Sequence, residues 1–230
     1  MRYDARMSGN VEEAYQRLFA AYGPQHWWPA ETPFEMIVGS VLTQNTHWSN
    51  VAKALENLRE EGLLDAAALH RLPADELAEL IRPAGYYRLK AGRLKRLLDL
   101  LFERFSGSLD EMFSLSLDDL RELLLSVNGV GPETADSILL YAGEFPTFVV
   151  DTYTHRVFKR HAWIEDDADY HALKDHIESG LERSAPLFNE YHALLVKVGK
   201  EHCGPKPKCE GCPLQELLPP RGPHEPAPLD

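Results

Sequence analysis

Apolar residues recur every three to four positions along almost the whole chain, the spacing that puts them on one face of an α-helix. The clearest case is the stretch 89–105, where Leu94, Leu97, Leu98 and Leu101 share one face. No segment alternates polar and apolar residues as a half-buried strand does, and no period indicates a repeat. The pattern therefore predicts an all-α protein.

Helix-start signals divide this pattern into elements. Thr32-Pro33-Phe34-Glu35 has an N-cap hydroxyl, a proline at the first helical position and an acid three residues after the cap, as in a capping box. Further helices are expected at about 47–61, 74–81, 89–105 and 117–125, and others from Pro132, Asp151, Asp169 and Glu190. The proline-rich segment 219–230 is expected to be a disordered tail.

The composition is that of an ordinary soluble protein. The 230 residues are 44% hydrophobic and 26% charged, which suffices for one large domain or two small ones with a buried core. No apolar run approaches the length of a membrane span, and the N-terminus lacks the basic-then-apolar pattern of a signal peptide. We therefore expect a cytoplasmic protein with no membrane partner.

The net charge of −12 argues against a general affinity for nucleic acids. Attraction to DNA follows the local field rather than the total charge, however. Basic residues cluster at 88–96, 155–160 and 197–208, whereas acidic residues lie mostly in 65–79, 110–122 and 165–169. Composition alone favours solvated helix faces for these clusters, so the charge permits DNA binding without indicating it.

Two glycines one residue apart follow the predicted helix 117–125. In Asn128-Gly129-Val130-Gly131 the chain makes a tight turn, and Pro132 then begins the next helix. Such a turn exposes backbone N–H groups beside a helix N-terminus, and these groups attract an anion. Because neither glycine carries a side chain, we expect that a phosphate can approach the main chain. An ordinary corner between two helices, with glycine as C-cap, has the same pattern, so the turn alone leaves both interpretations open.

The continuation of this turn is more specific. An apolar helix follows it, then the apolar run Phe148-Val149-Val150, and then Asp151-Thr152-Tyr153-Thr154-His155. This order resembles the helix–hairpin–helix DNA glycosylases of the endonuclease III superfamily, and the resemblance covers nearly the whole chain. Val41-Leu42-Thr43-Gln44-Asn45-Thr46 is similar to that family's early helix. Gly85-Tyr86-Tyr87-Arg88-Leu89-Lys90-Ala91 matches its glycine–aromatic–lysine–alanine element.

The resemblance implies two helical domains that flank a DNA cleft. A six-helix barrel would span 30–145 and end in the helix–hairpin–helix at about 121–141, and the second domain would join 1–29 to 146–218. The partner would be double-stranded DNA with a damaged base, bound by a monomer on the nucleoid. Gln44 would fill the gap that an extruded nucleotide leaves. The other residues that the resemblance places on DNA are Lys90, Asn128, Gly129, Val130, Gly131, His155 and Lys200.

Asp151 is the expected catalytic residue, by analogy with the aspartate that the family carries at a helix start. Its alternative role, a plain helix N-cap, is compatible with catalysis. Bifunctional family members carry a lysine eighteen residues before this aspartate, and its amine forms a Schiff base with the sugar. Here that position is Glu133, which cannot form an imine. The sequence therefore predicts a monofunctional enzyme in which Asp151 stabilises an oxocarbenium-like sugar and activates water.

Tryptophans indicate the substrate class. Trp27 and Trp28 precede Pro29, and Trp48 follows the Gln44 motif, an arrangement similar to the 3-methyladenine DNA glycosylases of this superfamily. An N-alkylated purine is cationic, so stacking on an aromatic ring adds roughly 0.5–2 kcal/mol of cation–π attraction. Each tryptophan could equally pack in the core. Glu133 would then either accept a hydrogen bond from the extruded base or lie at the surface.

All three cysteines fall within ten residues, at Cys203, Cys209 and Cys212, and resemble the iron–sulfur loop that closes most endonuclease III relatives. The first spacing is five residues where the family has six, and Leu218 stands where the fourth cysteine would be. We expect a [4Fe–4S] cluster with a non-cysteine fourth ligand, for which His202 is a candidate. A three-iron cluster, zinc or an empty loop are the alternatives.

The leading hypothesis is a monofunctional DNA glycosylase for alkylated purines such as 3-methyladenine. One rival in the same class is a glycosylase/lyase for oxidised pyrimidines or mismatched thymine. A rival in another class is a catalytically inactive DNA-binding module that recognises lesions. The acid at Asp151 argues against the inactive module, and the tryptophans argue against the pyrimidine enzyme.

Overall fold

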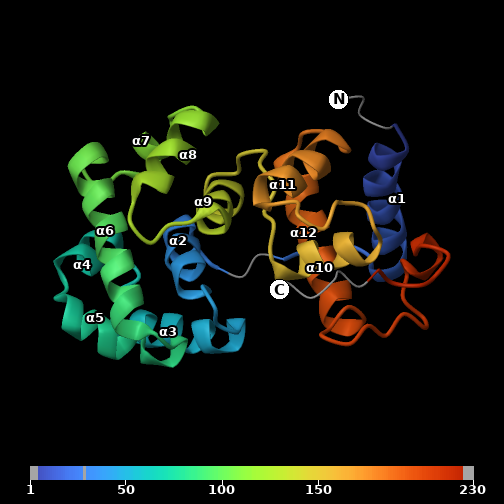
Figure 1. The fold of residues 1–230 in the computed structure, drawn as a ribbon. Coiled ribbons are helices and arrows are strands. Elements are labelled where there is room, and N and C mark those ends of the chain that lie inside the picture. Colours follow the sequence, from blue (N-terminus) through green and yellow to red (C-terminus); the bar gives the residue numbers. More distant parts are fainter. Residues whose placement is uncertain (1–4, 28–29, 225–230) are drawn as a thin grey trace. The chain divides into compact units, whose positions relative to one another are not determined.

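The computed structural model describes residues 5–27 and 30–224, and within these ranges every regular element is a helix. The prediction of an all-α protein is therefore confirmed for the described chain. No described helix is both long and apolar enough to cross a membrane. The chain divides into two compact units, coloured along the sequence in Figure 1. Unit 1 comprises 1–27 and 146–230, and unit 2 comprises 28–145.

Unit 2 is built around a short apolar helix, α2, which packs against α3, α6, α9 and η2. Eight of the ten residues of α2 are buried, as its almost uniformly apolar sequence requires. The elements of this unit are α2 (Pro33–Leu42), α3 (Trp48–Glu60), α4 (Ala66–Arg71), α5 (Ala74–Leu80), η1 (Arg82–Ala84), α6 (Tyr87–Phe105), α7 (Leu109–Phe113), α8 (Leu117–Ser126), α9 (Pro132–Ser137) and the π-helical turn η2 (Ile138–Ala142). α6 buries the leucine face that the sequence predicts.

The start of α2 follows its sequence signal with one change. The Thr32 hydroxyl accepts a hydrogen bond from the Glu35 N–H at 3.1 Å, as a cap should. The Glu35 carboxylate does not return to the cap residue. It accepts from the Glu31 N–H at 3.0 Å and pairs with Arg59 of α3 at 2.6 Å. The acid of the predicted capping box therefore ties α2 to α3 instead.

Unit 1 is organised by α12 (Ala185–Glu201), which packs against α1 (Ala5–Tyr22) and α10 (Thr152–Arg160). α1 also packs against α11 (Tyr170–Ser179), and the turn η3 (Gln215–Leu217) follows the cysteine loop. Figure 1 shows α1 beside α12, although they lie at opposite ends of the sequence.

Four helices depart from the sequence prediction. α1, α4 and α7 were not predicted, and α12 begins at Ala185 rather than at Glu190. The segment 219–224, predicted as part of a disordered tail, is held in place because the His224 N–H donates to the Arg160 carbonyl at 2.8 Å. Residues 225–230 lie outside the described residues.

Candidate active site and hairpin

Asp151 is the N-cap of α10, and its two carboxylate oxygens have different surroundings. Oδ1 accepts hydrogen bonds from the Thr154 N–H at 2.7 Å and from the Thr154 hydroxyl at 2.9 Å. Oδ2 instead faces the imidazole Nε2 of His192, 3.7 Å away. The cap thus fixes the carboxylate through one oxygen, and the side chain remains 15% exposed. Both roles expected for Asp151 are compatible with this geometry.

His192 was not predicted from the sequence. It lies on α12 and is 4% exposed, with its ring against Trp27 (centroids 5.6 Å apart) and edge-on to Phe148 (6.1 Å). Burial lowers the pKa of His192, and the nearby Asp151 carboxylate opposes this shift only in part. The imidazole beside Asp151 is therefore neutral at neutral pH. A histidine in the apolar run of α12 carries no sequence signal for this role, because only the packing of α12 on α10 brings it to Asp151.

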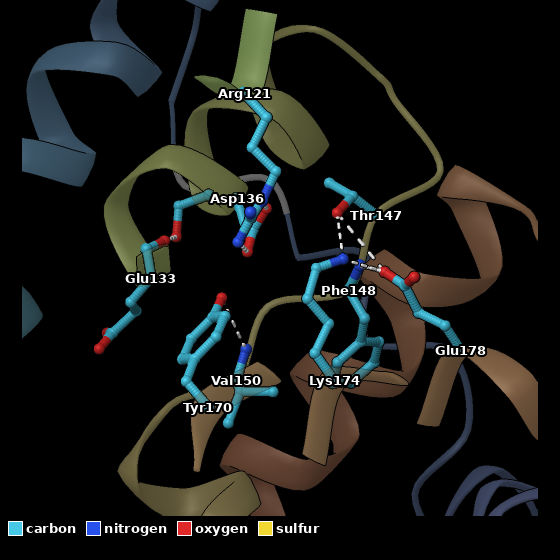
Figure 2. Close-up of polar contacts among 10 residues, drawn as sticks. Arg121, Glu133, Asp136, Thr147, Phe148, Val150, Tyr170, Lys174 and Glu178 are labelled. Atoms are coloured by element: carbon cyan, nitrogen blue, oxygen red, sulfur yellow. Dashed lines mark hydrogen bonds and ion pairs between the residues drawn. The ribbon is translucent and has the colours of Figure 1, made fainter. Parts of the chain in front are cut away.

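The segment that leads to Asp151 is held by side chains of α11. Figure 2 shows Lys174 and Glu178 pointing toward Thr147 and Phe148. The Glu178 carboxylate accepts from the Phe148 N–H at 2.6 Å, and Lys174 donates to the Thr147 hydroxyl at 2.6 Å and pairs with Glu178. These contacts fix the backbone three residues before Asp151.

A cavity of about 520 Å³ opens beside Asp151. Its walls include Val150, Tyr170 and the basic side chains of α10, among them His155 and Lys159. The predicted DNA contact His155 is half-buried on this wall, and Lys200 is exposed near the end of α12. A cavity of this size can hold a sugar and a water molecule next to a carboxylate.

The hairpin lies between α8 and α9 in unit 2. Gly131 is exposed and extended, and a Cβ added there would meet nothing within 4 Å, so an anion can approach it. Gly129 differs, because a Cβ added there would lie 2.5 Å from Cγ of Arg93. The expectation that both glycines are open to a phosphate is thus wrong for the Cβ side of Gly129. Val130 is buried, and its N–H donates to the Val127 carbonyl at 2.9 Å. This N–H is therefore not available to an anion.

Two ion-pair partners join the helices of the hairpin. The Arg121 guanidinium of α8 donates to both carboxylate oxygens of Asp136 in α9, at 2.8 and 3.1 Å. Asp136 is fully buried, and Figure 2 shows the two planar groups facing each other. Bidentate arginine–carboxylate pairs are among the strongest side-chain contacts, so α8 and α9 are held in a fixed orientation. Glu133, one turn earlier on α9, is exposed.

Lys90 does not lie on the surface, and its prediction as a DNA contact is wrong. It is 1% exposed, and its ammonium donates to the Leu42 carbonyl at 2.8 Å, the Ala84 carbonyl at 2.8 Å and the Thr46 hydroxyl at 2.6 Å. Burial, and secondarily the charge of Arg93, lowers the pKa of Lys90 to about 8. With all three donors occupied, Lys90 stabilises the end of α2 and the loop after it.

The three tryptophans have different positions. Trp27 lies against His192, next to Asp151. The ring of Trp48 packs on α2, where a Cβ added at Gly39 would approach it to 3.3 Å. Trp28 lies outside the described residues. Among the described members of the expected aromatic pocket, Trp27 is the one that contacts a neighbour of Asp151, namely His192.

The cysteine loop is held by an arginine. The Arg160 guanidinium donates to Cys203 Sγ at 3.3 Å, to the Gly204 carbonyl at 2.7 Å and to the Pro205 carbonyl at 2.9 Å. Burial raises the pKa of the Cys209 and Cys212 thiols in the metal-free loop.

The described cysteine loop is not arranged as a preformed site for the expected cluster. Leu218 lines the same cavity as the three cysteines, and that cavity, about 20 Å³, holds no more than a water molecule. His202, the candidate fourth ligand, uses its Nδ1 with the Lys208 carbonyl at 2.9 Å. In the described part of the chain, no group of three or more histidine, cysteine or acidic side chains could hold a metal ion. The expectation that the loop binds a cluster therefore stays a prediction.

Comparison with known proteins defines the class to which these features belong. Residues 38–183 match the model of the HhH-GPD superfamily base excision DNA repair proteins. The chain belongs to this superfamily and is a base excision repair DNA glycosylase of the endonuclease III type, a hydrolase of N-glycosyl bonds.

Individual relatives carry several different names. A protein assigned as a DNA repair glycosylase in Methanocaldococcus jannaschii is 46% identical over 90% of this chain and 94% of its own length. Endonuclease III of Thermotoga maritima is 30% identical over 89% of this chain and 90% of its own length. The crystal structure of the 3-methyladenine DNA glycosylase of H. pylori, bound to 1,N6-ethenoadenine, is 31% identical and superposes with a TM-score of 0.72 over 84% of this chain and 97% of that one.

Proposed function

We propose that this chain is a monofunctional DNA glycosylase that hydrolyses the N-glycosidic bond of alkylated purines in double-stranded DNA. The observation that carries the proposal is the state of Asp151. Its Oδ1 is occupied by the helix cap, while Oδ2 faces the His192 imidazole and the carboxylate borders an open cavity. A carboxylate fixed in this way can stabilise a developing cation and accept a proton without reorganising.

The geometry supports a direct hydrolysis. As the C1′–N bond breaks, its electron pair leaves with the base, and Oδ2 of Asp151 stabilises the positive charge on the sugar. A water oxygen forms the new bond to C1′ and its proton passes to Oδ2. A cationic alkylated purine leaves as a neutral base, so the step needs no general acid.

Lyase chemistry would require an amine that attacks C1′. Glu133 cannot do this, and it is exposed on the first turn of α9. Lys159 is the lysine that lines the cavity beside Asp151, and its ammonium is bonded to the Asp166 carbonyl. These two positions support a product with an intact strand.

The preference for alkylated purines is supported by Trp27 and by one relative. The Trp27 ring stands 5.6 Å from His192, which itself contacts Asp151, so an electron-rich aromatic face lies near the catalytic carboxylate. A cationic purine gains about 0.5–2 kcal/mol on such a face over a neutral base. The H. pylori relative acts, by its name, on 3-methyladenine.

A second candidate, a glycosylase/lyase for oxidised pyrimidines, is favoured by one observation. Lys159 lines the Asp151 cavity and could release its carbonyl partner to attack the sugar. The likeness to the Thermotoga maritima endonuclease III is consistent with that alternative.

A panel of duplexes separates these candidates. Each duplex carries one defined lesion: 3-methyladenine, 7-methylguanine, ethenoadenine, an oxidised pyrimidine, or thymine opposite guanine. We expect release of the cationic purines first, strand breakage only after alkali, and no adduct after borohydride. A borohydride-trapped complex that Lys159→Met abolishes would establish the lyase instead. Release from none of the duplexes would leave a lesion-binding module as the function.

A further inference from the structure

The side chain of Gln44 is bonded at both ends of its amide to the neighbourhood of the hairpin. Its Nε2 donates to the Gly129 carbonyl at 3.0 Å and to the Thr134 hydroxyl at 2.9 Å. Its Oε1 accepts from Nη1 of Arg93. Gln44 stands two residues beyond the end of α2, so these hydrogen bonds tie this loop to the turn between α8 and α9, to α9 itself and to α6.

Arg93, on α6, lies directly against Gly129. A Cβ at Gly129 would approach Cγ of Arg93 to 2.5 Å and Cδ to 2.9 Å, and Gly129 has φ +99°. Glycine is therefore required there for two reasons: the positive φ, and the lack of room for a Cβ beside the side chain of Arg93. The Nε of Arg93 is buried and finds no acceptor in the described part of the chain. A buried donor without a partner is unfavourable, so the contacts with Gln44 and Gly129 must hold the guanidinium in place.

Two further side chains of α6 hold the same region. Nε of Arg96 donates to the Asn128 carbonyl at 2.8 Å, and Lys90 binds Leu42 and Thr46 on either side of Gln44. Residues 90, 93 and 96 recur every three positions and so share one side of the helix. The loop after α2 and the hairpin are thus both fixed on α6.

We propose that Arg93 and Gln44 are positioning residues that set the shape of the hairpin, and through it the grip on DNA phosphate before any lesion is met. The inference rests on the proposed function only in taking the hairpin as a DNA contact. Gln44 then acts on intact DNA as well as on damaged DNA, beyond the gap-filling role expected from its sequence motif. Arg93 acts through Gln44 and Gly129, and its charge does not itself meet a phosphate.

The test measures binding to an undamaged duplex by fluorescence anisotropy, for four variants of the full chain. Arg93→Met keeps the aliphatic stem and removes the guanidinium, and Gln44→Met removes the amide without changing charge. Each should raise Kd about tenfold or more, and the double variant should be no weaker than the weaker single one. Arg104→Met removes the same charge from the exposed end of α6 and should change Kd less than about threefold.

Salt dependence separates positioning from direct contact. If Arg93 bound a phosphate, Arg93→Met would lower the slope of log Kd against log salt by about one, whereas a positioning residue leaves it unchanged. Arg93→Lys, which keeps a donor for Gln44, should recover part of the affinity. Unchanged Kd in Gln44→Met, additive losses, or a slope change in Arg93→Met would each overturn the proposal.

Amide hydrogen exchange in the DNA-free protein provides a readout that does not depend on the proposed function. Arg93→Met and Gln44→Met should accelerate exchange at Gly131 and its neighbours, with 152–177 in unit 1 unaffected. Faster exchange throughout the chain would indicate loss of the fold and would contradict a local positioning role for Arg93 and Gln44. If the wild-type chain excises no lesion while these variants behave as stated, the proposed function is contradicted and the positioning role of Arg93 and Gln44 is retained.

Discussion

The two units of this glycosylase place different kinds of polar group at their candidate functional segments. Unit 1 places a neutral imidazole, that of His192, against its candidate catalytic carboxylate. Unit 2 instead fixes its hairpin with permanent cations, the guanidinium groups of Arg93, Arg96 and Arg121. Arginine keeps its charge at all pH values at which proteins fold, whereas histidine changes its charge near neutrality. The comparison indicates that pH acts on the chemistry of unit 1 and leaves the hairpin of unit 2 unchanged.

The largest expected effect on stability concerns the buried cation of unit 2. Lys90→Met removes a donor from Leu42, Ala84 and Thr46 at once. We expect a loss of about 2–5 kcal/mol in the free energy of unfolding, because buried acceptors are left unsatisfied. Urea titration measures it, with Lys53→Met on an exposed part of α3 as control. Equal stability of the two variants would show that Lys90 is not a structural residue.

His192 should control the acid side of the pH–rate profile. Its lowered pKa means that it gains a proton only below its ordinary value of 6.5, and the imidazolium would then neutralise Oδ2 of Asp151. The wild-type excision rate should fall through that range, and His192→Gln should move the fall to lower pH. Identical profiles for the two proteins would contradict this role, and binding to undamaged duplex should vary little with pH in both.

Stability should follow pH in different windows in the two units. Burial lowers the pKa of three histidines of unit 1, His161, His176 and His192. Below the pKa of the folded state, burying the charged imidazolium lowers the free energy of unfolding. Above pH 6.5 the histidines are neutral in both states and this cost vanishes. Stability of unit 1 therefore rises with pH up to about 6.5. The pKa of Lys90 in unit 2 is likewise lowered, from 10.5 to about 8. The stability of unit 2 should therefore rise as the pH increases from about 8 to 10.5.

Hydrogen exchange of peptides from the two units distinguishes these windows. Protection in 152–177 should increase between pH 5 and 6.5 after correction for the intrinsic exchange rate, while protection in 87–105 should not. The opposite order would refute the assignment of the buried histidines as neutral groups.

The all-α class and the helix-capping role of Asp151 could be predicted from the sequence because both depend on local information, namely helical periodicity and an N-cap residue. The sequence could not foretell contacts between distant positions. Gln44 and Gly129 are 85 residues apart, and Asp151 meets His192 only because α10 packs on α12. Lys90 misled the prediction because lysine is usually exposed. The helices α4 and α7 were too short, at six and five residues, for periodicity to reveal them.

The smallest expected effect is that of the cysteine loop. Because Arg160 binds Cys203 and two loop carbonyls, we expect Cys209→Ser to change the free energy of unfolding by only about 0.5 kcal/mol. Arg160→Gln should cost about 1.5–3 kcal/mol, since it removes hydrogen bonds from a charged donor. Stoichiometric iron and sulfide in anaerobically purified protein, with unfolding of Cys209→Ser, would show that the loop does hold a cluster.

The most direct measurement compares two aspartates that cap helices in the same way. Asp151 accepts from the Thr154 N–H at 2.7 Å and Asp169 from the Ala172 N–H at 2.9 Å, and asparagine caps about as well as aspartate. Single-turnover excision from a duplex with one 7-methylguanine should fall about 100-fold to 10,000-fold in Asp151→Asn, with undamaged duplex bound normally. Asp169→Asn should excise at the wild-type rate. Excision by Asp151→Asn at the wild-type rate would contradict the account of this active site.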